Sequence, residues 1–248
     1  MYIGVNELIN LYKKPFDQNK KATDIAKKRV REQGLSISGK IGNSRVEDEK
    51  IIVIEEWNRK RENGKKAHRD IQQRESRLNE GGEGFIIGEY KKLETSEDGE
   101  ILNFPEIELK RKIHYYEKFL YNNRYKVVGY VDHLYIDPNG YINIEEYKCN
   151  ENFTTNFTFE KNGIRFIEKF KQPINNLIDS KLVYAQLQAS FYMYLVWTIN
   201  PRLKFGNIKI RHIVLNEEGD STGEEFLYDV PILLDEVKLI LKDHYKKQ

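Results

Sequence analysis

The chain has 248 residues, of which 39% are hydrophobic and 32% are charged, and its formal net charge is +2. This length can bury a substantial core, and no apolar run approaches the roughly 18 residues that a membrane span needs. The single cysteine, Cys149, excludes an internal disulfide and any four-cysteine zinc or iron–sulfur site. With no secretory signal at the N-terminus, we expect a cytoplasmic protein without a membrane partner.

Basic residues gather in two segments, 12–31 and 109–126, and tyrosine and phenylalanine are interleaved with those of the second. A basic stretch with aromatic residues suits a track for a polyanion such as nucleic acid. A solvated lysine-rich face explains each segment equally well.

The N-terminal third is predicted to be helical only in part. Residues 5–14 indicate a short helix, and the polar residues 15–45 indicate partly irregular structure. A long helix is predicted from Glu47 to about Leu78, with a break or bend near Asn63 and Gly64, because glycine costs about 1 kcal/mol inside a helix.

The middle of the chain is predicted to be mainly β-structure. Residues 80–90 indicate a loop and a short strand, and 95–100 form a turn before a strand at 101–109. The clearest hairpin pairs 125–136 with 141–149 through an Asp-Pro-Asn-Gly turn.

The C-terminal part alternates helix and strand. Residues 150–180 read as a polar insertion, and 180–200 as a strongly apolar helix that ends before a proline. Strands are predicted within 207–216 and 224–232, followed by a closing helix over about 231–245.

This order of elements predicts a mixed α/β fold. We expect a single domain over 1–248, with a helical N-terminal elaboration to about residue 46 and an inserted segment at about 150–180.

The hairpin places charged residues on an otherwise apolar face. Side chains two apart in a strand point the same way, so Glu146 and Lys148 share a face with two isoleucines. Folding about the turn brings Asp132 beside them. Two carboxylates and one amine therefore converge.

Burying these groups requires compensation. Mg²⁺ or Mn²⁺ would provide it, since such ions take one or two carboxylates together with a substrate phosphate. A structural ion pair on a half-exposed sheet provides it as well, and the hairpin alone leaves both interpretations open.

Asp132, Glu146 and Lys148 resemble the D…(D/E)-x-K signature of the PD-(D/E)XK nucleases. Two further patterns resemble the RecB-like exonuclease branch of that superfamily. Gly64 and His68 fit its G-x-x-x-H helix motif, and "QASFY" (188–192) fits its Q-x-x-x-Y motif. The patterns occur in the order of that branch over roughly residues 55 to 200.

The resemblance implies a restriction-endonuclease-like core, a central mixed β-sheet flanked by helices, and roles for single residues. The implied ligands of one or two Mg²⁺ or Mn²⁺ ions are His68, Asp132, Glu146 and the backbone carbonyl of Tyr147. Asp132, Glu146 and Lys148 are implied as catalytic, and Gln188 and Tyr192 as substrate-binding. Glu117 matches a carboxylate of the family through a loose alignment.

Simpler interpretations stand beside these roles. His68 also fits an exposed helix position, and Gln188 and Tyr192 also fit the edge of a buried helix. Glu145 lies on the opposite face of its strand and is expected to have no catalytic duty. The proline that names the superfamily is absent before Asp132, and the cysteines of an iron–sulfur cluster are missing.

The resemblance implies a metal-dependent deoxyribonuclease, with the Q-x-x-x-Y pattern favouring an exonuclease that acts in recombination, repair or phage DNA processing. Its partners would be DNA and proteins of recombination or replication. The abundance of Lys, Asn, Ile and Tyr suggests an AT-rich bacterial or phage genome. The alternative is a non-cleaving nucleic-acid-binding or structural subunit that retains the nuclease fold.

Overall fold

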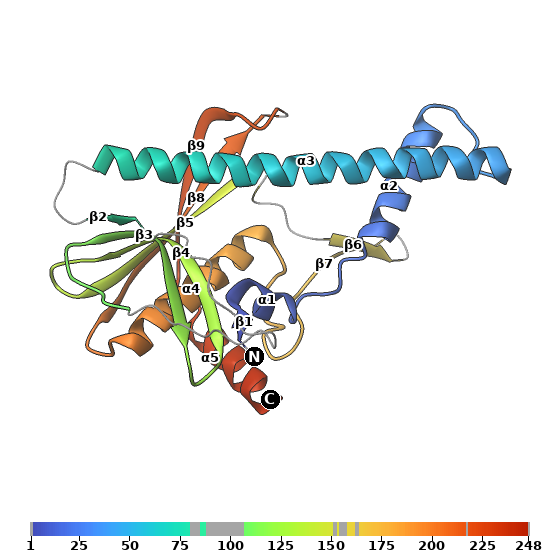
Figure 1. The fold of residues 1–248 in the computed structure, drawn as a ribbon. Helices are drawn as coiled ribbons and strands as arrows, with labels where there is room; N and C mark the ends of the chain where they lie inside the picture. Colours follow the sequence, from blue (N-terminus) through green and yellow to red (C-terminus); the bar gives the residue numbers. More distant parts are fainter. Residues whose placement is uncertain are drawn as a thin grey trace, which may run out of the picture.

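The computed structural model is a mixed α/β fold in which helices cover both faces of a central sheet (Figure 1). It describes residues 2–79, 85–87, 107–150, 153, 158–161, 164–216 and 218–247. The helices and strands, in chain order, are β1 (Ile3–Gly4), α1 (Val5–Asn10), α2 (Gln18–Glu32), α3 (Gly39–Asn79), β2 (Phe85–Ile87), β3 (His114–Asn122), β4 (Val127–Ile136), β5 (Tyr141–Asn150), β6 (Thr158–Lys161), β7 (Ile164–Ile167), α4 (Lys181–Ile199), β8 (Lys204–Leu215), β9 (Ser221–Val230) and α5 (Leu234–Lys246). The predicted α/β class is confirmed, and the arrangement is consistent with a restriction-endonuclease-like core.

The sheet has the strand order β2-β3-β4-β5-β8-β9, and β1 lies beside β4. The pairs β3–β4, β4–β5 and β8–β9 are antiparallel, whereas β1–β4, β2–β3 and β5–β8 are parallel. Because parallel strands need a long crossover, α4 joins β5 to β8 and packs against the sheet. The predicted hairpin, the helix at 180–200, the two late strands and the closing helix are all confirmed.

The turn of the β4–β5 hairpin has the expected chemistry. The Asp137 carboxylate accepts hydrogen bonds from the backbone N–H groups of Asn139 and Tyr141, both at 2.8 Å. Gly140 follows with a φ of 83°, a left-handed conformation that favours glycine.

The main core lies between the sheet and the helices α1, α4 and α5. α4 is apolar on nearly all sides, which fits a helix enclosed by a sheet on one side and by helices on the other. It begins at Ser180, whose hydroxyl accepts a hydrogen bond from the Val183 N–H at 3.1 Å. Val5 and Leu8 of α1 are buried in the same core, so the N-terminal segment is packed against the central sheet.

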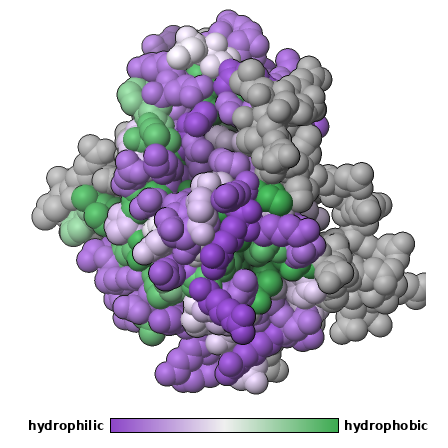
Figure 2. All heavy atoms as spheres, turned by 90° about the vertical axis from the view of Figure 1, so that its left-hand side faces the viewer, coloured by the Kyte–Doolittle hydropathy of each residue, from purple (hydrophilic) through white to green (hydrophobic). Residues whose placement is uncertain are grey.

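The other face of the sheet is covered by the C-terminal half of α3. Ile71 packs there against Tyr147 of β5 and against Ile213 and Leu215 of β8. The N-terminal half of α3 extends beyond the sheet and pairs with α2 to form an arm (Figure 1). Viewed from the side at which α3 ends, the described surface is mainly hydrophilic, with hydrophobic groups in separate patches (Figure 2).

The segment 15–45 is irregular at 15–17 and 33–38, so the prediction of partly irregular structure is confirmed there, but it is wrong in omitting two helices. α2 occupies 15 residues of this segment, and α3 begins at Gly39. Ala22, Ala26 and Val30 are spaced four apart on α2 and are buried. The apolar side of α2 consists of small side chains and the rest of the helix is strongly polar, so the segment has a low overall hydrophobicity that does not indicate a packed helix.

The prediction of a break near Asn63 and Gly64 is also wrong, because α3 is one helix of 41 residues. A Cβ atom on Gly64 would lie 3.0 Å from the carbonyl oxygen of Cys149 in β5. The glycine therefore permits close approach of helix and strand, and this packing offsets its poor helix propensity.

The predicted β-structure before the hairpin is displaced along the chain. The short strand expected within 80–90 is present as β2, whereas the expected turn at 95–100 and residues 101–106 lie outside the described residues. Residues 107–109 are irregular, and the strand in this region is β3. Of the predicted insertion at 150–180, the described part contains the small β6–β7 hairpin.

Within the described ranges, every helix is too short or too polar to cross a lipid bilayer.

Candidate active site

The candidate site lies where β4 and β5 separate. Their pairing runs from Ile136 opposite Ile142 to His133 opposite Glu145, and β4 then takes β1 as its neighbour. Beyond the last pair, the Asp132 carboxylate accepts a hydrogen bond from the backbone N–H of Tyr147 at 2.8 Å. The Asp132 side chain thus takes over the hydrogen bonding to β5 where the β4 backbone diverges from it. We call this point of divergence the strand fork.

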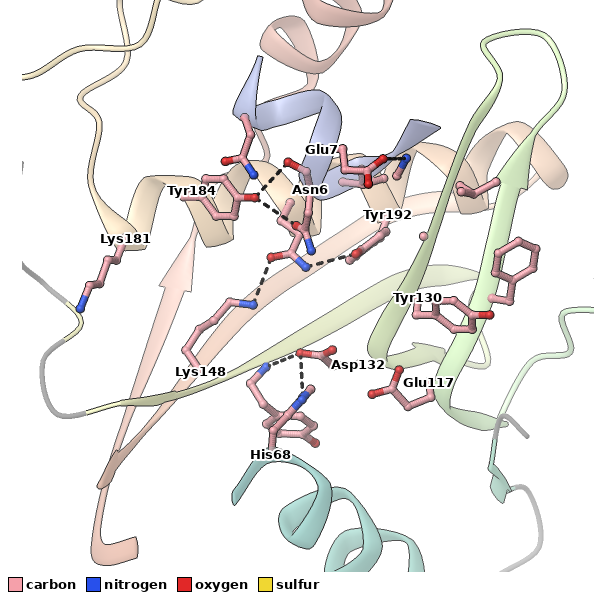
Figure 3. Close-up of a pocket in the computed structure, with 18 of the residues that line it drawn as sticks. Asn6, Glu7, His68, Glu117, Tyr130, Asp132, Lys148, Lys181, Tyr184 and Tyr192 are labelled. Atoms are coloured by element: carbon pink, nitrogen blue, oxygen red, sulfur yellow. Dashed lines mark hydrogen bonds and ion pairs between the residues drawn. The ribbon is translucent and has the colours of Figure 1, made fainter. Parts of the chain in front are cut away.

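The predicted convergence of two carboxylates and a lysine is present. Asp132 is 6% exposed and Glu146 is completely buried. Lys148 Nζ lies 3.0 Å from Glu146 Oε2 and donates to Gln188 Oε1 at 3.1 Å. The Gln188 amide in turn donates to the Tyr192 hydroxyl at 3.1 Å, so the two α4 residues of the Q-x-x-x-Y pattern both reach the site (Figure 3).

His68 reaches Asp132 from α3, on the other face of the sheet. Its Nε2 atom lies 3.4 Å from Asp132 Oδ2, and Figure 3 shows the ring directed toward Asp132. Gln72, one turn further along α3, lies 3.2 Å from His68 Nε2 and donates to Glu117. The expectation that an early helix brings a histidine to the hairpin acids is confirmed for Asp132.

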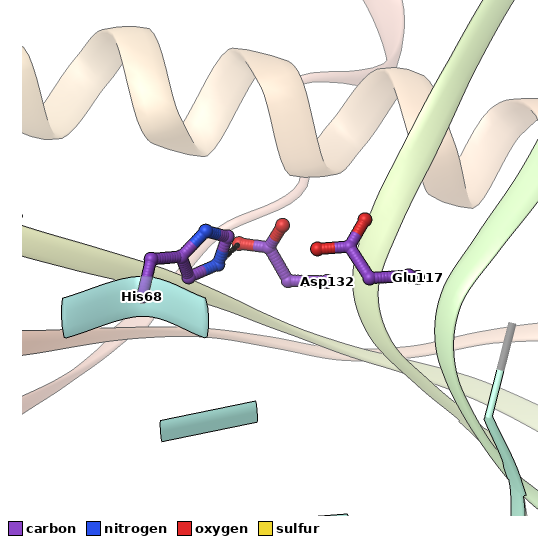
Figure 4. A group of neighbouring side chains, drawn as sticks. All are labelled: His68, Glu117 and Asp132. Atoms are coloured by element: carbon purple, nitrogen blue, oxygen red, sulfur yellow. Dashed lines mark ion pairs between the residues drawn. The ribbon is translucent and has the colours of Figure 1, made fainter. Parts of the chain in front are cut away.

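Glu117 completes this group from β3. The β3–β4 register places it across from Asp132, and its backbone has a φ of 49°, which is uncommon for a non-glycine residue. Ligand atoms of His68, Glu117 and Asp132 all lie within 4.8 Å of one another (Figure 4). These three residues can hold a metal ion.

The donor set suits a divalent cation, because carboxylate oxygens and one imidazole nitrogen are common ligands of such ions. A second observation agrees with this interpretation. Glu146 Oε1 is buried and has no hydrogen-bond partner within the part of the chain that the structure describes. Such an oxygen is costly unless something compensates it, and a nearby cation would do so. Glu146 itself lies outside the three-residue group, with its other oxygen turned to Lys148.

The two hairpin acids have opposite electrostatic environments. Burial and the negative charge of Asp132 raise the pKa of Glu146 well above its usual value. Burial also acts on Asp132, but the hydrogen bond from His68 and the charge of Lys148 outweigh it and lower its pKa. Ionisation is therefore easier for Asp132 than for Glu146, and a further positive charge beside Glu146 would favour its ionised form.

The acids of the site in turn stabilise the charged forms of His68 and Lys148. Burial opposes the charge on His68, but the hydrogen bond and charge of Asp132 outweigh it and raise the pKa of the imidazole. Lys148 behaves in the same way: burial opposes its charge, and the charges of Glu146 and Asp132 raise its pKa overall. Lys148 is thus an ammonium group rather than a free base.

Glu145 has a different environment from its neighbour Glu146. Its carboxylate lies 2.7 Å from Arg211 Nε and 3.2 Å from His133 Nδ1, on the face that α3 covers. The expected position of Glu145 on the opposite face is confirmed, and its partners give it a structural explanation.

The site opens into a cavity of about 970 Å³. His68, Glu117, Asp132, Lys148, Gln188 and Tyr192 line it, and so do residues of the N-terminal segment that were not expected there, namely Asn6, Glu7, Asn10 and Lys13. Pairing of β1 with β4 and packing of α1 on α4 bring this segment to the cavity. Tyr184 of α4 fixes it further by donating to the Asn6 backbone carbonyl at 3.2 Å. The sequence signal for this segment is the amphipathic spacing within α1, in which Asn6 and Asn10 are four apart and lie on its polar side.

No family model matches the chain, and no curated protein is significantly similar to it.

Proposed function

We propose that the chain is a metal-dependent nuclease that hydrolyses phosphodiester bonds in DNA. One observation carries the proposal: two acids, a histidine and a lysine from four separate elements converge at the strand fork and line one cavity, and a third acid, Glu146, is buried against the lysine. Structural ion pairs alone give no reason to bury Glu146 with an unpartnered oxygen.

His68, Glu117 and Asp132 would hold the divalent cation, with Glu146 and the Tyr147 carbonyl as further candidate ligands. When bound, such an ion neutralises the scissile phosphate and lowers the pKa of water toward neutrality. The same positive charge would favour ionisation of Glu146, whose pKa is raised in the metal-free protein.

Lys148 supplies a fixed positive charge for the phosphate. As an ammonium group it can donate to a phosphate oxygen and stabilise the charge that develops there in the transition state. Gln188 holds the lysine at 3.1 Å, and the Tyr192 hydroxyl fixes the orientation of the Gln188 amide. These contacts preorganise the donor before substrate arrives.

The resemblance of the three sequence patterns to the RecB-like exonucleases is the basis for proposing DNA as the substrate and end-dependent cleavage. It is also the basis for a role in recombination, repair or phage DNA processing. The cavity supports this interpretation through its half-buried rings of Tyr2, Tyr130 and Tyr184, on which unpaired bases can stack.

The proposal is tested by incubating the protein with end-labelled linear DNA and with circular DNA, in Mg²⁺, Mn²⁺ or EDTA. We expect degradation of linear DNA only with a divalent ion, a loss of about 10²-fold or more in Lys148→Ala, and persistence of the circles. Lys209→Ala is the matched control, since Lys209 also lies in a strand but outside the cavity. Equal rates for wild type and Lys148→Ala would refute the role of the lysine, and absence of cleavage by the wild type under all conditions would refute the proposed activity.

A further inference from the structure

α3 carries a row of basic residues beside the cavity, at Arg61, Lys65 and Arg69. All three are exposed. They are spaced four apart, so they lie along one side of the helix. Neither of the basic segments at 12–31 and 109–126 includes them.

The position of this row follows from the contacts of its neighbours. Successive residues of a helix are turned by roughly 100° about its axis. Ala67 and Ile71 pack against the sheet, and next to them around the helix come His68 and Gln72, which reach Asp132 and Glu117. Arg61 lies at nearly the same angle as these two residues, about two turns before His68, and Lys65 and Arg69 come next in the same direction. The basic row therefore borders the metal-binding residues on the side away from the sheet.

We propose that Arg61, Lys65 and Arg69 bind the phosphate backbone of the nucleic acid strand that enters the cavity. This inference rests on the proposed function and adds to it the surface along which the substrate approaches. Exposed lysine and arginine side chains hold phosphates without reading sequence, which suits an enzyme that cleaves many sequences.

The present contacts of the row are easily exchanged for phosphate. Lys65 Nζ lies 2.8 Å from Glu62 Oε1, but the two side chains are 59% and 63% exposed, and such a pair contributes little to stability. The Arg69 Nε–H donates to the backbone carbonyl of Lys65 at 3.3 Å, which leaves the other guanidinium donors directed away from that bond.

The basic residues of α2 are less well placed for this task. Arg29 is engaged by Glu49 at 3.1 Å and by Glu56 at 2.8 Å, which fixes α2 to the N-terminal half of α3. That part of the arm lies beyond the sheet, away from the end of α3 that carries His68 (Figure 1).

The chain offers a matched control on the same helix. Arg59 and Lys66 are also exposed, but their angular positions are roughly opposite to His68. We compare two double variants, Arg61→Gln/Lys65→Gln and Arg59→Gln/Lys66→Gln. Each removes one arginine and one lysine from one side of α3. Both change the net charge by the same amount, so long-range electrostatics affects them equally.

Binding is measured by fluorescence anisotropy of a labelled single-stranded oligonucleotide in EDTA at several salt concentrations. We expect Arg61→Gln/Lys65→Gln to weaken binding on the order of tenfold and to reduce the slope of log K against log salt by roughly 1 to 2. Arg59→Gln/Lys66→Gln should retain nearly the wild-type slope.

Equal losses in the two variants, or no loss in either, would overturn the inference, and so would a wild type that does not bind the oligonucleotide. The metal-dependent cleavage assay with Lys148→Ala decides the proposed function separately. Cleavage by the wild type together with equal binding by the two double variants would support the proposed nuclease activity and refute only the phosphate-binding role of Arg61, Lys65 and Arg69.

Discussion

The carboxylate of Asp132 makes two contacts. It accepts a hydrogen bond from the backbone N–H of Tyr147 at 2.8 Å, and its Oδ2 atom lies 3.4 Å from His68 Nε2. The first closes the strand fork and the second belongs to the candidate metal site. Substitutions at this one position can separate the two contributions.

Asp132→Asn and Asp132→Ala should both lose Mn²⁺ affinity, because each removes a negatively charged ligand. Asparagine retains an oxygen that can accept from Tyr147, whereas alanine leaves that buried N–H unsatisfied. We therefore expect Asp132→Ala to be less stable than Asp132→Asn by about 1–3 kcal/mol. Denaturant unfolding in EDTA and Mn²⁺ titration measure the two effects, and equal stability of the variants would contradict the role of this hydrogen bond.

Glu146→Gln should stabilise the metal-free protein at neutral pH. Burial and Asp132 raise the pKa of Glu146 in the folded state, so between the unfolded and folded pKa values the folded state binds more protons. The stability of the wild type therefore falls as pH rises through this window, and glutamine, which stays neutral, removes that loss. We expect a gain in the free energy of unfolding near pH 7 that shrinks as the pH falls toward the ordinary pKa of a glutamate.

Unfolding of both proteins by denaturant in EDTA from pH 4.5 to 8 checks this prediction. The same substitution should reduce Mn²⁺-dependent activity, so stability and function would change in opposite directions. A difference in stability that is constant with pH would show that Glu146 is already ionised in the folded protein.

The hairpin and α4 could be predicted from the sequence because their signals are local. An Asp-Pro-Asn-Gly turn between two apolar runs specifies a hairpin, and a long apolar segment that ends before proline specifies a buried helix. The positions of Asp132, Glu146 and Lys148 followed from strand alternation alone. The strand fork was not predictable, since it depends on β1, which is distant in sequence, taking the place of β5 beside β4.

β3 shows why the rest of the site was harder to predict. Its burial does not alternate regularly: Tyr115 and Tyr116 are both buried, and so are Phe119 and Leu120. The phase changes at Glu117, whose left-handed backbone turns its side chain toward Asp132. A strand that departs from period two at a candidate metal ligand is hard to recognise from its sequence pattern, and so is the ligand.

Gly129→Ala should impair catalysis through Tyr192. A Cβ atom at this position of β4 would lie 2.5 Å from Cε1 of Tyr192, so the ring must move. Its hydroxyl would then no longer hold Gln188, and Lys148 would lose its orientation. We expect a fall in kcat of about tenfold with Mn²⁺ affinity nearly unchanged, and an overpacking cost of about 1–3 kcal/mol.

Tyr192→Phe is the matched variant, because it keeps the ring and removes only the hydroxyl. It should share the fall in kcat without most of the loss of stability. Full activity in Tyr192→Phe would show that the hydroxyl does not orient Gln188 for catalysis.

Arg211 should set the position of α3, and hence of His68, at the candidate metal site. It lies between β5 and the helix, with Nε 2.7 Å from Glu145 and Nη1 3.6 Å from Glu75, two turns beyond His68. Its guanidinium also covers the ring of Tyr147 at 5.6 Å. Arg211→Ala should therefore weaken Mn²⁺ binding about tenfold by calorimetry, with partial recovery in Arg211→Lys, which keeps the charge but not the planar fork.

Arg29→Ala provides the comparison that isolates this effect. Arg29 likewise joins two carboxylates, Glu49 and Glu56, and fixes α3 to a neighbouring element, but it does so in the arm. Both alanine variants should unfold at lower temperature, because each breaks a network of charged hydrogen bonds. Only Arg211→Ala should lose Mn²⁺ affinity, so equal affinities in the two variants would assign Arg211 to stability alone.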